Sequence, residues 1–95
     1  MKQPAVYILA SKPNGTLYIG VTSNLSVRIE AHQLDTVPGF TSRYAVHLLV
    51  HFELCDDMAA AIMREKRLKK WNRLWKIRLI ERGNPQWRDL SGEIG

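Results

Sequence analysis

The sequence contains only one cysteine, Cys55, among its 95 residues. A lone thiol excludes an internal disulfide framework and a zinc site built from cysteines, so a reducing cytoplasm is the expected compartment. No apolar run approaches the roughly 20 residues that span a bilayer. The N-terminus, whose short apolar stretch soon meets polar residues, lacks the pattern of a secretory signal. We therefore expect no membrane partner.

Repeats, linkers and low-complexity segments are also missing. The length is close to that of one domain. With 45% hydrophobic and 24% charged residues, the composition is globular rather than disordered. The sequence thus predicts a single domain over residues 1–95, in which residues 81–95 form a helix end and a tail packed on the rest.

Positive charge is concentrated in one part of the chain. The whole chain carries a net charge of +5, but residues 64–82 hold nine basic and two acidic residues, a net +7 that leaves −2 for the remainder. A concentrated basic stretch attracts phosphates and is typical of nucleic-acid binding. The alternative is a solvated helix with long charged side chains.

The hydrophobic pattern and the turn residues predict the element order β-β-α-β-α-α, an α+β arrangement. Asn14-Gly15 marks the turn of a hairpin, Ser23 or Asn24 can cap the first helix, and Asp56-Asp57 can begin the second. Gly83 is a suitable helix end. The expected elements are strands over 5–10 and 16–21, a helix over 25–34, a loop over 35–43, a strand over 46–54, and helices over 58–70 and 73–82.

Two tyrosines of the hairpin are expected on the same face of the sheet. Side chains alternate along a strand, and a connecting loop with an even number of residues sets odd positions opposite even ones. Tyr7 and Tyr18 then point the same way. They are either two aromatic residues packed in a core or two phenols directed into one site.

Polar residues also interrupt the apolar stripes of two helices. Leu25, Ile29, Arg28 and His32 share one stripe of the first helix, so Arg28 and His32 are expected on or beside its buried side. An arginine there needs an anionic partner unless its head group reaches solvent, and the histidine can be a half-buried, hydrogen-bonded residue.

A carboxylate lies in the middle of the next apolar stripe. Glu65 falls among Met58, Ala61, Ile62 and Leu68. Such a residue is either paired with a buried cation, for which Arg28 is the strongest candidate, or holds a metal ion. Basic residues on the other faces of this helix would gather phosphates around it.

These residues resemble the motifs of the GIY-YIG endonucleases. Ala5-Val6-Tyr7 followed by Leu17-Tyr18-Ile19-Gly20 is similar to the paired motif that names the family. The segment from Val21 to Arg28, with His32 one turn later, is similar to the helix motif of the family. Arg64-Glu65-Lys66 and the residues up to Trp71 are similar to the segment with its metal-binding glutamate. The match covers nearly the whole chain and is closest to the short, free-standing bacterial members.

The resemblance implies a small three-stranded antiparallel sheet flanked by helices, and metal-dependent hydrolysis of DNA with Mg²⁺ or Mn²⁺. It implies catalytic roles for Tyr7, Tyr18, Arg28, His32 and Glu65, with Glu65 as the metal ligand. We expect a DNA-binding surface from Lys66, Lys69, Lys70, Arg73 and Arg43. Supporting positions at the site are Gly20, Asn84 and Tyr44.

The sequence departs from the family pattern in places. The first motif lacks its glycine and has Ala5, and Val21 stands where some members carry a lysine. Other members use an asparagine downstream of the glutamate; Asn72 and Asn84 are the candidates, and Asn84 is favoured because Asn72 can simply end a helix. Which tyrosine acts as the general base stays open.

The expected function is that of an endonuclease with structure-based or weak sequence specificity, acting in DNA repair or recombination. The alternatives are a non-catalytic nucleic-acid-binding module with the same fold, and a nuclease subunit targeted by a partner protein. The oligomeric state stays open. Trp71 and Trp75 are interpreted as helix-packing anchors, and His47 and His51 as residues on the surface of a strand.

Overall fold

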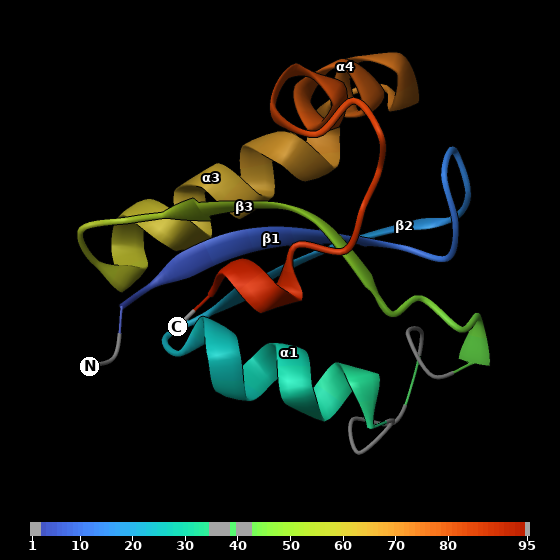
Figure 1. Ribbon diagram of the computed structural model, residues 1–95. Coiled ribbons are helices and arrows are strands. Elements are labelled where there is room, and N and C mark those ends of the chain that lie inside the picture. Colours follow the sequence, from blue (N-terminus) through green and yellow to red (C-terminus); the bar gives the residue numbers. More distant parts are fainter. Residues whose placement is uncertain (1–2, 35–38, 40–42, 95) are drawn as a thin grey trace.

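The structure is a computed structural model that describes residues 3–34, 39 and 43–94. The described elements follow the predicted order β-β-α-β-α-α and then add a short 3-10 turn (Figure 1). In chain order they are β1 (Ala5–Ala10), β2 (Leu17–Thr22), α1 (Leu25–Gln33), β3 (Leu48–Leu54), α3 (Met58–Lys70), α4 (Arg73–Gly83) and η1 (Ser91–Glu93). The predicted bounds hold to within two residues, while most of the predicted loop over 35–43 lies outside the described residues.

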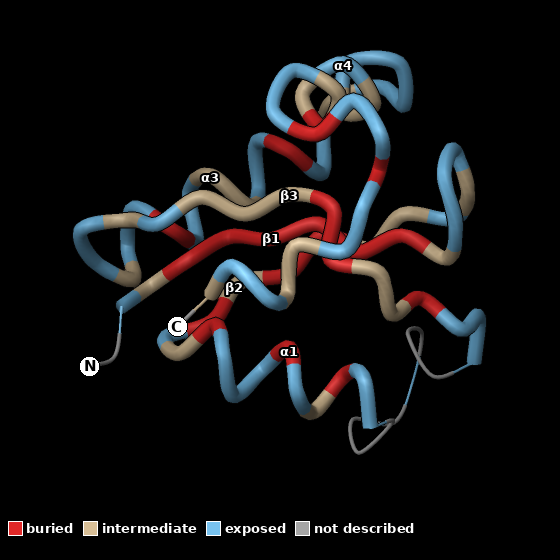
Figure 2. The backbone as a smooth tube through the Cα atoms, in the orientation of Figure 1, coloured by how far each residue is buried: buried red, intermediate tan, exposed pale blue. Residues whose placement is uncertain are grey.

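The three strands form one antiparallel sheet in the order β2-β1-β3. In the hairpin, Ala10 pairs with Leu17 and Leu9 pairs with Tyr18, so the connecting loop has the even length that the face assignment required. β1 is the central strand and is buried along its whole length (Figure 2). A register shift in the pairing of β1 with β3 falls between Ile8 and Leu9. The α+β fold with a three-stranded antiparallel sheet is thereby confirmed.

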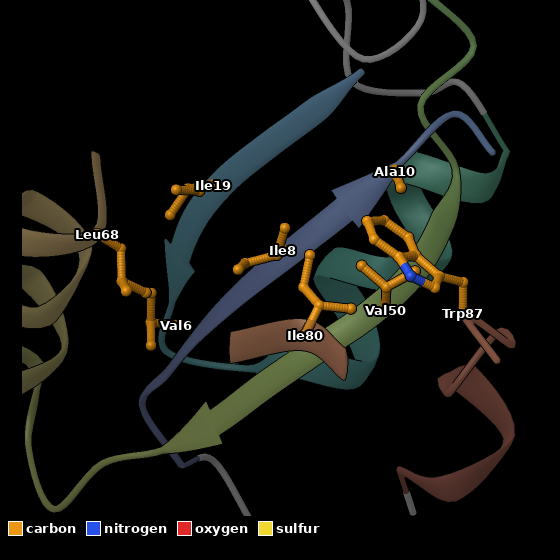
Figure 3. Packing of buried hydrophobic residues seen from close by; sticks show 8 residues of the cluster. All are labelled: Val6, Ile8, Ala10, Ile19, Val50, Leu68, Ile80 and Trp87. Carbon is orange, nitrogen blue, oxygen red and sulfur yellow. The ribbon is translucent and has the colours of Figure 1, made fainter. Parts of the chain in front are cut away.

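Helices cover both faces of the sheet. α3 and α4 lie on one face and α1 on the other, with η1 near α1 (Figure 1). Because side chains alternate along β1, the two faces have separate cores. The core under α3 and α4 contains Val6, Ile8, Ala10, Ile19, Val50, Leu68, Ile80 and Trp87 (Figure 3). The core under α1 contains Ala5, Tyr7, Leu9, Leu25, Ile29, Val46 and Leu49.

Each main helix begins at an asparagine or aspartate that caps it. Asn24 accepts a hydrogen bond from the backbone N–H of Val27, and Asp57 accepts one from Ala60 at 2.8 Å. Asn72 accepts one from Trp75 at 2.9 Å, so it begins α4 rather than serving a site. These bonds satisfy N–H groups that a helix start leaves unpaired.

The C-terminal tail is fixed to β3. Asn84 ends α4, and its Nδ2 donates to the carbonyl oxygens of Val50 and Arg88, while its Oδ1 accepts from the N–H of Arg88. The N–H of Leu90 then donates to the carbonyl of Leu49 at 2.8 Å. Trp87 is 4% exposed and belongs to the core.

Among the described helices, none has both the length and the apolar character to cross a membrane.

Candidate active site

The two hairpin tyrosines lie together on the α1 face of the sheet. Tyr7 pairs with Gly20 and Tyr18 pairs with Leu9, which makes the tyrosines diagonal neighbours across β1 and β2. Their ring centroids are 6.4 Å apart at an interplanar angle of 41°. Tyr7 is 1% exposed, whereas Tyr18 is only partly buried. The prediction that the two tyrosines share a face is confirmed, and Tyr7 also belongs to the core under α1, with Tyr18 packed against it.

His32 completes an aromatic triangle with these tyrosines. Its ring centroid lies 5.7 Å from each tyrosine ring, and its Nε2 is 2.9 Å from the hydroxyl oxygen of Tyr7. Leu25, Ile29 and His32 form the buried stripe of α1, which directs the imidazole toward β1. His32 is 1% exposed, so this hydrogen bond is sealed from solvent.

Arg28 lies at the solvent side of this cluster. It is exposed, which agrees with the alternative of an arginine beside the buried stripe whose head group reaches solvent. Its charge opposes the rise that burial causes in the pKa of Tyr7, and it adds to the lowering that burial causes in the pKa of His32. An exposed guanidinium whose charge acts on Tyr7 is available to an anion from solution.

Burial controls the protonation of the two inner groups. Burial is the main cause that raises the pKa of Tyr7 well above 10, and the Tyr18 and Glu65 charges add to it. Burial is also the main cause that lowers the pKa of His32 below 6.5, with contributions from Arg28 and His47. Both side chains are therefore neutral at pH 7, and the hydrogen bond between them joins uncharged partners.

Gly20 makes room for the Tyr7 ring. A Cβ placed on Gly20 would collide with the hydroxyl and Cζ of Tyr7 and would lie 2.9 Å from Cε2. The hydroxyl of Tyr7 thus rests directly over the backbone of β2. The alanine that replaces the first-motif glycine, Ala5, is fully buried in the same core.

Glu65 belongs to α3, which packs on β2 and β1. Its side chain is 15% exposed, and its charge raises the pKa of Tyr7. Its carboxylate pairs with Lys69 of the same helix at 3.2 Å, rather than with Arg28 as the sequence alternative proposed. Ala61 and Leu68 form the buried stripe of α3, whereas Ile62 is 38% exposed and stands outside the predicted stripe.

The donor set suits one kind of metal ion. The described residues contain no group of three or more histidine, cysteine, aspartate or glutamate side chains that could enclose a metal. Mg²⁺ does not require such an enclosure, because it keeps several waters and binds one or two carboxylates together with substrate phosphates. A single, mostly buried carboxylate such as Glu65 fits that mode.

The residues predicted to bind nucleic acid divide into two groups. Lys66 and Lys70 are exposed, and Lys69 helps to line a hollow of about 310 Å³. This hollow adjoins the site, because its lining is Leu17, Tyr18, Ile19, Lys69 and Lys76. Lys76 belongs to the basic stretch over 64–82, but the sequence did not predict it as a DNA-binding residue.

Arg73 instead holds the hairpin turn. Its Nη2 donates to the carbonyl oxygens of Asn14 and Gly15 at 2.6 and 2.7 Å. Asn14 has a positive φ of 59°, which its short polar side chain tolerates. The arginine thus ties α4 to the turn that connects the two tyrosine strands.

Three other predicted residues lie outside the aromatic cluster. The side chain of Asn84 forms its hydrogen bonds with backbone groups of β3 and of the C-terminal tail. It therefore lies at the β3 edge of the sheet, opposite β2. Tyr44 is 49% exposed, and the guanidinium of Arg43 lies over its ring at 5.7 Å. The residues before them, 40–42, which the sequence assigned to a DNA-facing loop, fall outside the described part.

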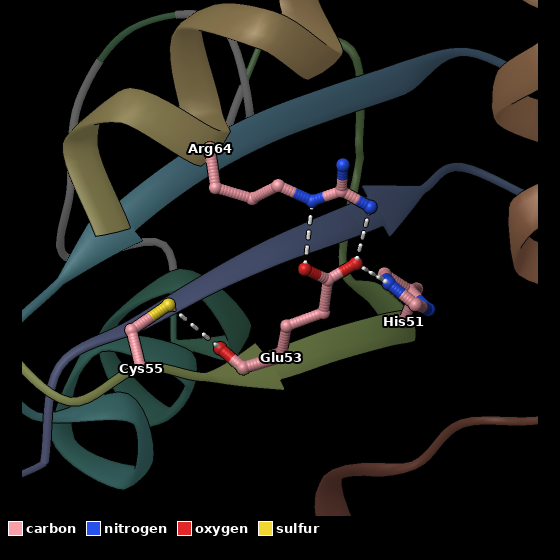
Figure 4. A network of polar contacts seen from close by, with 4 residues as sticks. All are labelled: His51, Glu53, Cys55 and Arg64. Carbon is pink, nitrogen blue, oxygen red and sulfur yellow. Dashed lines mark hydrogen bonds and ion pairs between the residues drawn. The ribbon is translucent and has the colours of Figure 1, made fainter. Parts of the chain in front are cut away.

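The sequence did not predict a polar network that connects α3 with β3. Arg64 donates from Nε and Nη2 to the carboxylate of Glu53 at 2.8 and 3.1 Å, and His51 lies 2.8 Å from the same carboxylate (Figure 4). The His51 and Arg64 contacts outweigh burial and lower the pKa of Glu53 to about 2. The Sγ of Cys55 contacts the Glu53 carbonyl. The only sequence signal was the spacing of His51 and Glu53 on one strand face.

The fold and the cluster define a class of protein: a small α+β domain in which two tyrosines and a histidine lie together on one face of the sheet, and in which the charges of an arginine and a glutamate act on the inner tyrosine. Comparison with known proteins gives the family. The model of the GIY-YIG catalytic domain matches residues 3–78. The chain therefore belongs to the GIY-YIG family, which is a family of nuclease type.

Relatives of similar length extend this match over most of the chain. A UPF0213 protein of Clostridium perfringens is 39% identical over 89 residues, which cover 94% of this chain and 95% of the relative. A UPF0213 protein of Syntrophus aciditrophicus is 33% identical over 87 residues, which cover 90% and 98%. These names state no activity. No solved structure gives a significant match.

Proposed function

We propose that this protein is a metal-dependent endonuclease that hydrolyses DNA phosphodiester bonds with structure-based or weak sequence specificity. The observation that carries the proposal is the cluster of Tyr7, Tyr18 and His32, whose inner tyrosine is acted on by the charges of Arg28 and Glu65. A cytoplasmic role in DNA repair or recombination fits such an activity.

Arg28 is the group that would hold the scissile phosphate. Hydrolysis of a phosphodiester needs the phosphate fixed in line with an attacking water and relief of the charge on its oxygens. A planar guanidinium can bind two phosphate oxygens at once. Arg28 is exposed, yet its charge reaches both Tyr7 and His32, so a phosphate bound there would lie against the tyrosines.

The two tyrosines would then have different tasks. The raised pKa of Tyr7 keeps its hydroxyl protonated at neutral pH, so it can donate or share a hydrogen bond but not act as a base. We assign the proton-accepting role to Tyr18. It is partly exposed to solvent, and it lines the hollow that Lys69 and Lys76 also border, called the basic hollow below. His32 holds the Tyr7 hydroxyl in place through the 2.9 Å contact.

Glu65 is the residue that would hold Mg²⁺ or Mn²⁺. The bound ion would supply Lewis-acid stabilisation of negative charge on the phosphate. Lys69, which now pairs with Glu65, is 56% exposed and can turn to a phosphate instead. Lys69 and Lys76 border the hollow beside Tyr18, and we propose that the DNA backbone enters there.

Two other functions compete with this one. A non-catalytic binding module would need the basic hollow but not the buried Tyr7–His32 pair or a mostly buried glutamate. A nuclease subunit targeted by a partner protein would have the same site and would cut poorly alone. The retained cluster favours an enzyme over the binding module.

The test is incubation of the purified protein with plasmid, single-stranded and branched DNA, with Mg²⁺, with Mn²⁺ and with EDTA. We expect cleavage of at least one substrate with a metal and none with EDTA. Glu65→Ala and Arg28→Ala should abolish it while the circular dichroism spectrum is unchanged. Binding of every substrate without cleavage would support the module instead.

A further inference from the structure

A second hollow lies on the β3 side of α3, where Arg64 reaches Glu53. It has a volume of about 230 Å³. Its lining combines two tryptophans, three arginines and one leucine, and includes no carboxylate among the residues that the structure describes. The lining residues are Arg64, Trp71, Trp75, Arg78, Leu79 and Arg82. We call it the tryptophan–arginine hollow.

One face of α4 supplies most of this hollow. Trp75, Arg78, Leu79 and Arg82 follow the spacing i, i+3, i+4 and i+7, which places them on a single helical stripe. Within that stripe Leu79 packs against the core, whereas Trp75 is 53% exposed and Arg78 and Arg82 are exposed. Trp71 packs against the core, as the sequence interpretation proposed, whereas the exposed Trp75 contacts the ring of Trp71 and is no core anchor.

The two indole rings form a corner. Trp71 and Trp75 are 5.9 Å apart between ring centroids, and their planes meet at 88°. The guanidinium of Arg64 lies over the Trp71 ring at 5.1 Å. Because Glu53 binds that guanidinium at two points, Arg64 and Trp71 form a wall whose geometry is set before any ligand arrives.

Two arginines of the lining carry charges that no carboxylate of the described residues compensates. Arg78 and Arg82 make no ion pair with another described residue, whereas the charge of Arg64 is compensated by Glu53. Stacking surfaces for flat rings beside unpaired arginines are the combination by which proteins bind single-stranded nucleic acid. Bases stack on the aromatic rings, and phosphates meet the arginines.

We propose that the tryptophan–arginine hollow binds unpaired nucleotides of a DNA strand, with a base against the corner of Trp71 and Trp75 and phosphates on Arg78 and Arg82. This hollow shares no lining residue with the hollow that Tyr18 and Lys69 line. This inference rests on the proposed function only in taking DNA as the ligand. It narrows the substrate to DNA that carries a single-stranded segment.

The site favours nucleic acid over an acidic protein segment. An acidic peptide would use the arginines but would gain little from an exposed indole corner, because carboxylates do not stack. A base gains from both the ring faces and the arginines. A peptide partner is accordingly kept as an outcome of the experiment.

The experiment measures binding of labelled oligothymidylate by fluorescence anisotropy, with the full chain carrying Glu65→Ala so that the DNA stays intact. Trp75→Ala should weaken binding roughly tenfold, since stacking on one aromatic contributes about that factor per base. Trp75→Phe, which keeps a ring, should recover most of the loss. An abasic oligonucleotide of equal length should bind the parent protein weakly, and Trp75→Ala should change that affinity little.

Charge is tested by a matched pair. Arg78→Ala and Arg67→Ala each remove one exposed arginine, but only Arg78 lines the hollow. Arg78→Ala should weaken oligothymidylate binding several-fold more than Arg67→Ala does. Equal effects of the two, or no effect of Trp75→Ala, would overturn the proposal.

A polyglutamate peptide that displaces oligothymidylate from the parent, and binds more weakly to Trp75→Ala, would overturn the proposal in favour of a protein partner. Because all arms read binding by a variant without Glu65, they decide this question whether or not the parent protein cuts DNA. Failure of the cleavage assay alone would leave these binding results standing.

Discussion

Replacing Gly20 by alanine tests the position of the Tyr7 ring. The new Cβ would collide with the hydroxyl and Cζ of Tyr7, so the ring must move. Tyr7 is 1% exposed and is held by His32 at 2.9 Å, which leaves it no free space to enter. Forcing extra atoms into such a packed site costs about 1–3 kcal/mol, and loss of the hydrogen bond adds about 1 kcal/mol.

One effect of the Gly20→Ala substitution stabilises the protein. Alanine reduces the conformational entropy of the unfolded chain, which stabilises the protein by about 0.4–1 kcal/mol. The net expectation is a loss of about 2 kcal/mol in the free energy of unfolding. For a domain of this size that corresponds to a Tm lower by roughly 8–16 °C.

Gly83→Ala is the matched control. Gly83 is the last residue of α4, and a Cβ added there meets nothing within 4 Å. Alanine is the better helix residue, so this variant should keep or slightly raise the Tm. Thermal unfolding followed by circular dichroism compares the two. A Gly20→Ala protein as stable as Gly83→Ala would refute the placement of Tyr7 over β2.

Three further predictions concern hydrogen bonds and pH. Because burial lowers the pKa of His32 below 6.5, the unfolded chain binds the proton more readily, so stability to urea should fall as the pH drops below 6.5; His32→Gln should flatten this dependence. The His51 and Arg64 contacts lower the pKa of Glu53 to about 2, so the stabilisation of the fold by this carboxylate is present above about pH 4.5 and is lost as the pH falls toward 2. After solvent screening this stabilisation amounts to roughly 1–2 kcal/mol. Glu53→Gln should lose it at every pH. Asn84→Ala should lower the Tm by several degrees, since it removes hydrogen bonds to the carbonyl of Val50 and to both backbone groups of Arg88. An unchanged Tm together with lost DNA cleavage would instead place Asn84 in the active site.

Local patterns were enough to predict the central part of the site. The alternation of a strand and the even loop length put Tyr7 and Tyr18 on one face, and the register confirms it. The helical stripe through Leu25 and Ile29 directed His32 inward. These inferences succeed because side-chain direction within one element depends on its own period.

Contacts between elements were not predictable in this way. The pairing of Arg64 with Glu53 joins a helix to a strand, and Arg73 binds carbonyls of a turn 58 residues away. Asn84 bonds only to backbone groups, which every sequence position offers equally. The exposure of Trp75 likewise depends on which face of α4 meets the sheet, and the stripe pattern alone leaves that open.

The most direct test of the proposed nuclease site is the rate of Mg²⁺-dependent DNA cleavage by Glu65→Gln, compared with Glu30→Gln. Both changes replace a carboxylate by an amide on a helix, but Glu30 is exposed on α1, whereas Glu65 is 15% exposed and its charge acts on Tyr7. We predict that Glu65→Gln loses cleavage and that Glu30→Gln cuts at the parent rate. Full metal-dependent cleavage by Glu65→Gln would contradict the account.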